Sequence, residues 1–369
     1  DADFCVQIFI FSDFFLFSCL LVAETFRKQE SLHSLPSLID AISVDDAFAI
    51  ENTNGCDFNS SKLSRVQEID YPRSWSASVF PRRGRSDPGI IVLQKRVAQI
   101  KSWIEACDDT DGRVHGRVMT LRTVTGRMAH NSPNMAQIPA VYSPYGKECR
   151  ALWTVNKGYK LVGVDASGLE LRMLAHYMND ERYTHEVVNG DIHTANQTAA
   201  GLESRDKAKT FIYAFIYGAG SKKIGSIIGG SERDGERIKE KFLRATPSLR
   251  SLREKVERIA SRRWVRGLDQ RKIIIRYPHA ALNTLLQGAG ATVMKYALTL
   301  LEEYVKIKQI KALPVVNVHD EFQYEVEEKR ADEFGMLAVQ SIVDAGKQLN
   351  VRCPLNGKYK IGNNWSETH

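Results

Sequence analysis

Hydrophobic and polar positions alternate on both sides of residues 317–321. The alternating apolar residues are Val316, Val318, Phe322, Tyr324 and Val326. This period of two predicts two strands joined by a turn, so a β-hairpin is expected here. The hairpin turn places two acids, Asp320 and Glu321, in succession at a strand end. Two interpretations stay open: a solvated acidic turn, or carboxylate ligands for a divalent metal ion.

A second acid ends another predicted strand about 150 residues upstream. Residues 160–165 are a short apolar run that ends in Asp165, and a helix with one apolar stripe is expected from about Gly168. Asp165 alone fits a helix cap. However, if the two strands are neighbours, Asp165 and Asp320 can hold two divalent ions roughly 4 Å apart, the geometry of in-line phosphoryl transfer.

A third pattern predicts a helix at 205–217, capped by Ser204 and ended by Gly218. Four residues recur at every fourth position and form a stripe along one side: Arg205, Lys209, Tyr213 and Tyr217. The opposite side is apolar and is expected to pack inward. The stripe suits a nucleoside triphosphate, with the cations on phosphates and the tyrosines on sugar and base. The alternative is a solvated basic face.

Several other segments have polar side chains suited to nucleic acid. His193 precedes the stripe and could donate to a phosphate, although a structural role is the alternative. A helix is expected over 278–291, with Asn283 and Gln287 on one face, where they can bond to a groove or simply pair within a packed helix. Residues 293–310 are expected to continue as an amphipathic helix, and further helices are expected at about 91–106 and 328–349.

Charge and cysteine usage narrow the class of protein. The net charge is +7, and residues 236–276 hold 14 Lys or Arg against 5 Asp or Glu, which favours a polyanionic partner. The six cysteines are scattered without a C-x-x-C pair, as expected for reduced thiols in an intracellular protein and not for a disulfide framework or a zinc site.

The first 90 residues show no functional pattern. Residues 4–23 are 16 of 20 apolar, a length that suits a membrane span. Asp13 in the centre would cost about 3 kcal/mol in a bilayer, so a buried helix or a segment foreign to the original reading frame is expected instead. Pro, Ser, Arg and Gly at 72–89 predict a linker. The chain begins with Asp, which suggests a fragment.

Three motifs together resemble the polymerase domain of family-A DNA polymerases, the DNA polymerase I superfamily, in the form found in podovirus-type phages. The resemblance covers about residues 92–369. Residues 165–172 (DASGLELR) are similar to motif A, the Arg205–Tyr217 stripe to the fingers helix of motif B, and 318–321 (VHDE) to motif C. The segments around Arg127 and Gln137 also match. Any one motif is weak, but their order and spacing make the resemblance specific.

The resemblance implies an α+β right-hand fold with an antiparallel palm sheet, helical fingers and a truncated thumb. It implies DNA-directed DNA polymerase activity in phage replication, with primer-template DNA and dNTPs as partners and two Mg²⁺ ions as cofactor. The implied metal ligands are Asp165, Asp320 and the carbonyl of Ala166. The implied dNTP-binding residues are Arg205, Lys209, His193, Tyr213, Tyr217 and the steric gate Glu170. The implied residues beside the duplex are Arg127, Gln137, His279, Asn283 and Gln287.

Two of these residues have a further implied part in catalysis. Lys209 protonates the departing pyrophosphate, and Glu321 is an auxiliary carboxylate near the primer end. The implied domains begin with an unassigned segment at 1–90 and the base of a residual thumb at 91–155. Palm (156–185), fingers (186–270) and a second palm portion with the motif C hairpin (271–369) follow.

The departures from the family pattern set the alternatives. Ninety unmatched residues are too few for a 3′–5′ exonuclease domain, so no proofreading is expected in this chain, and no processivity or replisome partner is identifiable. The protein is expected in the host cytoplasm, without a membrane. The alternative functions are an inactive DNA-binding remnant of such a polymerase or a single-subunit RNA polymerase. Glu170 argues against the RNA polymerase, because a gate that rejects the ribose 2′-OH is useless there.

Overall fold

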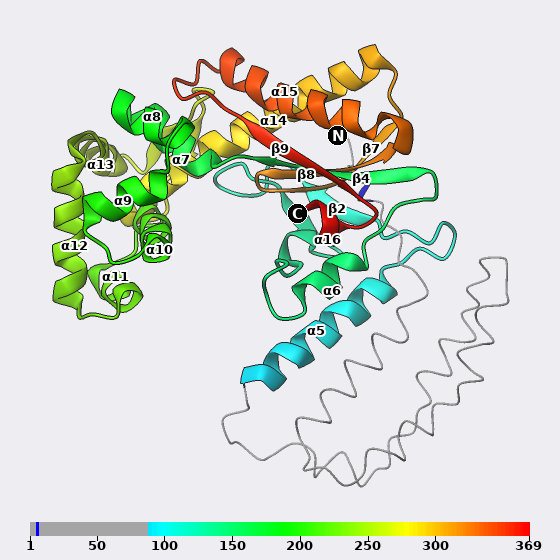
Figure 1. Ribbon diagram of the computed structural model, residues 1–369, viewed down its shortest axis with the longest axis horizontal. Helices are drawn as coiled ribbons and strands as arrows, with labels where there is room; N and C mark the ends of the chain where they lie inside the picture. Colours follow the sequence, from blue (N-terminus) through cyan, green and yellow to red (C-terminus); the bar gives the residue numbers. More distant parts are fainter. Residues whose placement is uncertain (1–4, 7–87) are drawn as a thin grey trace, which may run out of the picture. The chain divides into compact units, whose positions relative to one another are not determined.

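The computed structural model describes residues 5–6 and 88–369 of the chain (Figure 1). The expectations for the apolar segment 4–23 and for the linker at 72–89 therefore fall almost entirely outside the described residues. The described part of the apolar segment, Cys5–Val6, forms strand β1 and not a helix. In the described part of the chain, no helix is long and apolar enough to span a membrane.

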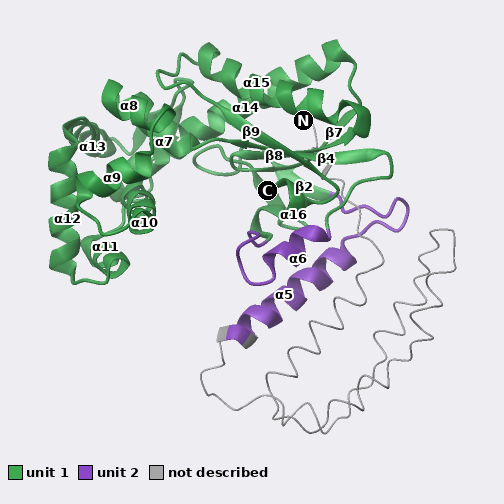
Figure 2. Ribbon diagram, in the orientation of Figure 1, with its two compact units in different colours: residues 1–8, 116–138, 153–369 green, residues 9–115, 139–152 purple. Residues whose placement is uncertain are grey.

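The chain divides into two compact units (Figure 2). The described residues of the larger unit are 5–6, 116–138 and 153–369. Those of the smaller unit are 88–115 and 139–152. The smaller unit contains helices α5 (Pro88–Glu105) and α6 (Gly146–Ala151). Helix α5 confirms the helix predicted at about 91–106.

The larger unit is built on a four-stranded antiparallel sheet in the order β7–β8–β4–β9. Its strands are β4 (Tyr159–Ala166), β7 (Ala312–Val318), β8 (Glu321–Glu327) and β9 (Gly357–Gly362). Val162 and Val164 of β4 are completely buried and pair with Tyr324 and Phe322 of β8. The predicted strand and hairpin are confirmed, and they are neighbours in the sheet.

Two long helices accompany this sheet (Figure 1). Helix α15 (Ala331–Gln348) packs against β4 and β9, and α14 (Ala281–Lys308) packs against α15. Gly335 of α15 lies so close to β9 that a Cβ atom there would be 2.3 Å from the Tyr359 ring. The helix can therefore approach the sheet at this point only because the residue has no side chain.

A group of helices and a small hairpin extend from the end of β4 within the same unit (Figure 1). The helices are α7 (Leu169–Met178), α8 (Glu181–Val188), α9 (Ile192–Ala200), α10 (Arg205–Ile216), α11 (Ser221–Ile228), α12 (Glu232–Ala245) and α13 (Pro247–Ala260). The hairpin consists of β5 (Trp264–Arg266) and β6 (Lys272–Ile274). Helix α10 is capped by the Ser204 side chain, which accepts from the Lys207 N–H. Its buried Phe211 and Phe215 both pack edge-on against Phe242 of α12. The predicted helix and its inward apolar side are confirmed.

The helix predicted over 278–291 differs at its start, and its predicted continuation over 293–310 is confirmed. A 3-10 turn, η2 (Pro278–Ala280), leads into the single helix α14. Helix α14 continues through Gly288 and Gly290. Both glycines lie in tight contacts, since a Cβ atom would be 2.5 Å from Ile273 Cδ1 at the first and 3.2 Å from Leu169 Cδ2 at the second.

Short elements complete the described chain. They are β2 (Gly116–Met119), β3 (Ala129–Asn131), η1 (Met135–Gln137), η3 (Glu328–Arg330) and α16 (Trp365–Thr368). Strands β1, β2 and β3 pair in that order. Helix α16 packs on β9 and β4, which brings the last residues of the chain close to the end of β4 where Asp165 lies.

Candidate active site

Asp165, Asp320 and Glu321 meet at one end of the β4–β8 strand pair. Asp165 of β4 is the register partner of Glu321, the first residue of β8. Asp320 lies in the turn between β7 and β8, and its carbonyl oxygen accepts a hydrogen bond of 3.0 Å from the Ala166 N–H. Acids 155 residues apart in the chain therefore lie at the same end of the sheet, because antiparallel pairing brings the end of β4 to the start of β8.

The electrostatics of this edge show acids held close to one another. Partial burial, together with the nearby Asp320 and Glu321 carboxylates, raises the pKa of Asp165 to about 6. Burial also raises the pKa of Asp320, against the opposing effect of the Arg127 guanidinium. Carboxylates that resist ionisation in each other's presence are suited to sharing a cation. All the donors here are oxygens, which fits a hard divalent ion.

Glu321 has a different environment from the two aspartates. Its carboxylate is only 4% exposed, and it accepts hydrogen bonds from Gln323 Nε2 at 2.6 Å, Trp365 Nε1 at 2.6 Å and His369 Nδ1 at 2.7 Å. Burial raises the pKa of Glu321, but these donors outweigh burial and hold it below its usual value. The role of the segment around Trp365 was missed by sequence reasoning, since nothing in its local pattern indicates a contact 44 residues away.

Glu170 joins the first turn of α7 to α10 and to the segment that follows β2. Its Oε1 accepts a hydrogen bond of 3.1 Å from Arg127 Nη2, and Tyr217 Oη donates to Oε2 at 2.9 Å. Burial and the adjacent Glu170 carboxylate raise the pKa of Tyr217 above its ordinary value, so the tyrosine stays a neutral donor. Arg127 and Tyr217, which the sequence placed in different roles, thus both bond Glu170.

The two tyrosines at the end of the α10 stripe lie near the acids. Tyr217 Oη bonds Glu170. Burial raises the pKa of Tyr213, and the nearby Glu170, Asp320 and Asp165 carboxylates act in the same sense. The Tyr213 ring lies 6.4 Å from that of Tyr217 and 6.3 Å from that of His193, measured between centroids. Aromatic rings therefore form a continuous row beside the carboxylate edge.

The cations of the stripe lie toward the start of α10. Lys209 is exposed. The Arg205 guanidinium makes two hydrogen bonds to Asp191, with Nε to Oδ2 at 2.7 Å and Nη2 to Oδ1 at 3.2 Å. Asp191 also caps α9 by accepting from the His193 N–H. Burial lowers the pKa of His193, and Arg205 and Lys209 lower it further. Sequence reasoning did not identify Asp191 as the partner of Arg205.

Four of the five residues predicted beside the duplex lie on three elements of the larger unit, and the fifth, Arg127, lies between β2 and β3. Gln137 ends η1 and is exposed, and His279 lies in η2, where its ring stacks on Tyr277 at 5.6 Å between centroids. Asn283 and Gln287 lie on the first turns of α14 and are half-buried. The carbonyl of His279 lies against Gly218, where a Cβ atom would be 2.4 Å away. The start of α14 therefore adjoins the end of the stripe.

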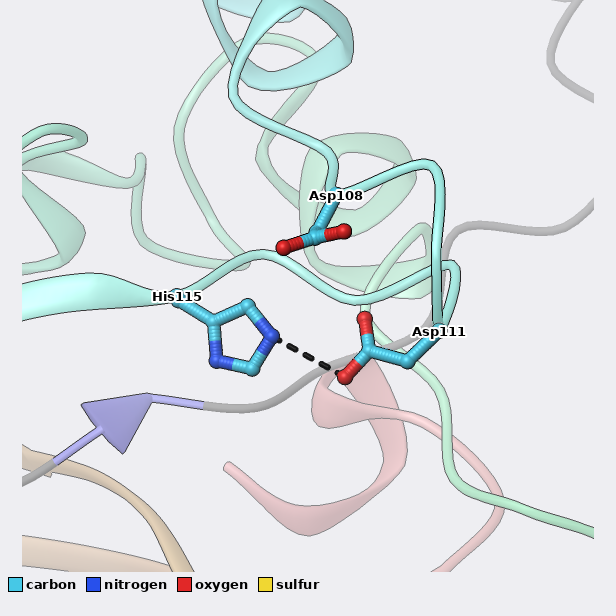
Figure 3. Close-up of side chains that lie close together, drawn as sticks. All are labelled: Asp108, Asp111 and His115. Atoms are coloured by element: carbon cyan, nitrogen blue, oxygen red, sulfur yellow. Dashed lines mark hydrogen bonds and ion pairs between the residues drawn. The ribbon is translucent and has the colours of Figure 1, made fainter.

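A separate cluster of possible metal ligands lies in the smaller unit. Asp108, Asp111 and His115 bring one ligand atom each within 4.8 Å of the others (Figure 3). His115 Nε2 lies 3.0 Å from Asp111 Oδ2, and Asp108 accepts from Thr110. The two aspartates are exposed, and the loop satisfies them locally, so this cluster has no feature beyond an ordinary polar turn.

Comparisons with known proteins show the family to which this fold belongs. The chain belongs to DNA polymerase family A, whose family model matches residues 91–367. It is 41% identical to the DNA-directed DNA polymerase of Escherichia phage T7, with 76% of this chain and 45% of that protein covered. It is 31% identical to the thermostable DNA polymerase I of Thermus filiformis, over 69% of this chain and 33% of that protein.

A solved structure extends the comparison to the fold. The POL domain of Pol1 from M. smegmatis, in complex with DNA primer-template and dNTP, matches with a TM-score of 0.74 at 17% identity, covering 98% of this chain and 68% of that one. The right-hand polymerase fold and the resemblance to phage polymerases are therefore confirmed. The chain spans less than half the length of the curated relatives described here.

Proposed function

We propose that this chain catalyses template-directed DNA synthesis in phage replication, adding dNTPs to a primer 3′-OH with release of pyrophosphate. The observation that supports this most strongly is the meeting of Asp165 and Asp320 at one sheet edge, opposite the Tyr213–Tyr217 row of α10. Palm at 156–185 and 271–369, fingers at 186–270 and a thumb base at 91–155 are the corresponding division of the chain.

Polymerases of family A use divalent metal ions, and the proposed ions here are two Mg²⁺. Asp165, Asp320 and the Ala166 carbonyl would hold them, which fits the all-oxygen donor set and the raised pKa of Asp165. The ions would supply Lewis acidity to the attacking hydroxyl and the leaving phosphate oxygen. Glu321 would be an auxiliary carboxylate near the primer end. The bonds from Trp365 and His369 hold it ionised and fixed.

The residues of α10 and α9 would bind the nucleotide. Arg205 and Lys209 would contact the triphosphate together with His193, and Lys209 would protonate the departing pyrophosphate. Tyr213 would lie beside the sugar, and Tyr217 near the templating base.

Glu170 would act as the steric gate against a ribose 2′-OH, held in place by Tyr217 and Arg127. Contacts with the duplex are assigned to the remaining polar residues of the site: Arg127, Gln137, His279, Asn283 and Gln287.

Primer extension with the purified chain tests this proposal. With a primer-template, dNTPs and Mg²⁺, the wild-type chain should add nucleotides, and Asp165→Ala and Asp320→Ala should each abolish addition. Asp109→Ala, an exposed acid of the smaller unit, is the matched control and should be active. Binding of primer-template without any nucleotide addition would instead identify an inactive DNA-binding remnant. Efficient use of rNTPs by the wild type would identify an RNA polymerase.

A further inference from the structure

Arg271 follows the turn of the β5–β6 hairpin, and Asp269 lies against both its backbone N–H and its guanidinium. The turn is closed by a hydrogen bond of 2.8 Å from the Gly267 N–H to the Arg271 carbonyl. Asp269 Oδ1 accepts from the Arg271 N–H at 3.3 Å, and Asp269 Oδ2 forms an ion pair with Arg271 Nε at 3.3 Å, although Nε donates no hydrogen bond to a described residue.

The Arg271 guanidinium lies against a segment 146 residues earlier in the chain. Its Nη2 donates to the Thr125 carbonyl at 3.2 Å. At the next residue, Gly126, a Cβ atom would be 2.3 Å from Nη2 and 2.8 Å from Nη1, and φ is +81°. The left-handed backbone conformation therefore favours glycine here. The guanidinium lies directly against the Gly126 backbone, in the space that a side chain would otherwise take.

Helix α14 supports the same arrangement from a second element. Ile273 of β6 is buried against Gly288 of α14. Lys295, further along α14, donates from Nζ to the Thr120 carbonyl at 2.6 Å. Arg271 and Lys295, on two different elements, therefore bond the carbonyls of Thr125 and Thr120. A small pocket lined by Gly126, Arg127, Lys295 and His319 borders this segment, so the segment is not packed on every side.

The residue after Gly126 is Arg127, which bonds Glu170 at 3.1 Å. Glu170 is also bonded by Tyr217 of α10. Contacts and two residues of backbone therefore link the hairpin turn to the proposed sugar gate. Asp269 pairs with Arg271, and Arg271 bonds the Thr125 carbonyl. The backbone leads from Thr125 to Arg127, and both Arg127 and Tyr217 bond Glu170. A shift of the Thr125–Gly126 backbone moves the Arg127 side chain and removes one of the bonds that orient Glu170.

We propose that Arg271 is a positioning residue for nucleotide selection. It holds the Thr125–Gly126 backbone so that Arg127 can fix the Glu170 carboxylate beside the sugar of the incoming nucleotide. This proposal rests on the polymerase function proposed above. It assigns to the β5–β6 hairpin, which touches neither the acids nor the α10 stripe in any described contact, a part in sugar discrimination.

The test compares Arg271→Gln, Arg271→Lys and the control Arg266→Gln. Arg266 is an exposed arginine of the same hairpin whose guanidinium bonds only the Gln270 carbonyl among the described contacts. The readout is the ratio of kcat/KM for a dNTP to that for the matching rNTP. Arg271→Gln should lower this ratio about tenfold, the size of one lost oriented contact. Arg271→Lys, which can still bond Thr125, should lower it less, and Arg266→Gln should leave it within about twofold.

A double-mutant cycle with Arg127→Gln tests whether the two arginines act in one series. If they do, the double variant has the same selectivity as Arg127→Gln alone, because the second change removes nothing further. Multiplying effects of the two changes would overturn the proposal. So would an unchanged ratio in Arg271→Gln with a lowered Tm, since that is the result of a purely structural role.

The proposal and the polymerase function fail in different ways. A wild-type chain that extends no primer refutes the polymerase function itself. A wild type that extends, with an Arg271→Gln variant of normal selectivity, refutes only the positioning role. Should Arg271→Gln not fold, Asp269→Asn removes the anchor while retaining the arginine, and it should lower the same ratio. Unchanged selectivity in a folded Asp269→Asn chain, measured beside Arg266→Gln, would likewise overturn the proposal.

Discussion

Replacing Asp165 by Asn is expected to abolish DNA synthesis while making the metal-free chain more stable. Holding Asp165 ionised beside Asp320 and Glu321 costs free energy in the folded state, as its pKa of about 6 shows. A rise from 3.8 to about 6 corresponds to roughly 3 kcal/mol at neutral pH. Asp165 is only partly shielded, because the residue as a whole keeps access to solvent, so screening by water reduces this to about 1–1.5 kcal/mol.

The sign of the pH dependence follows from the raised pKa. The folded chain binds a proton more tightly at Asp165 than the unfolded chain does, so this group favours folding at low pH. That contribution is lost as the pH rises from about 4 to about 6. Asp165→Asn cannot titrate, so its stability advantage over the wild type should grow across this window and reach its full size above pH 7.

Urea unfolding in EDTA at several pH values between 5 and 8 measures this difference. Glu321→Gln is the matched comparison, because the pKa of Glu321 is lowered by its hydrogen-bond donors. That variant should lose about 1.5–3 kcal/mol, the size of a hydrogen-bonded buried charge. An Asp165→Asn chain that is less stable than the wild type at pH 7.5 in EDTA would refute the reasoning that the acids repel one another.

Three further outcomes are expected. Glu170→Ala should raise ribonucleotide incorporation at least tenfold, measured as the dNTP-to-rNTP ratio of kcat/KM; unchanged sugar selectivity would contradict the gate role. Arg205→Lys should raise the KM for dNTP about tenfold, because a lysine cannot donate in the bidentate geometry seen with Asp191; an unaltered KM in steady-state titrations would exclude a triphosphate role. Burial holds the pKa of His176 at about 4, and Arg352 adds to this, so folding stability should fall as the pH drops from 6.5 to 4 by up to about 3 kcal/mol. His176→Asn should flatten this part of the urea-unfolding profile, and a profile as steep as that of the wild type would assign the titration to another group.

The local elements of the site were predictable because their signals lie within a few residues of one another. The apolar run before Asp165 predicted β4, and Ser204 and Gly218 bounded α10 within one residue. The hairpin at Asp320 followed from alternation alone, although Glu321 begins the second strand and is not part of the turn. Family resemblance then brought these pieces together in one site, where periodicity alone had left the alternatives open.

The contacts between distant segments were not predictable, because no local pattern encodes them. Glu321 is bonded by Trp365 and His369, whose positions depend on how α16 packs on the sheet. Likewise, Arg271 reaches Thr125 only because the β5–β6 hairpin packs on α14. Such pairings depend on the register and packing of whole elements, which sequence spacing does not specify.

The Asp191–Arg205 pair has a consequence for which ligands can enter the site. In the described structure the guanidinium already has an anionic partner, so a newcomer must displace a carboxylate before it can bind there. If Arg205 and Lys209 bind the triphosphate as proposed, the Asp191–Arg205 pair would disfavour a lone phosphate, which only exchanges one anion for another. It would favour a ligand whose further phosphates also reach Lys209.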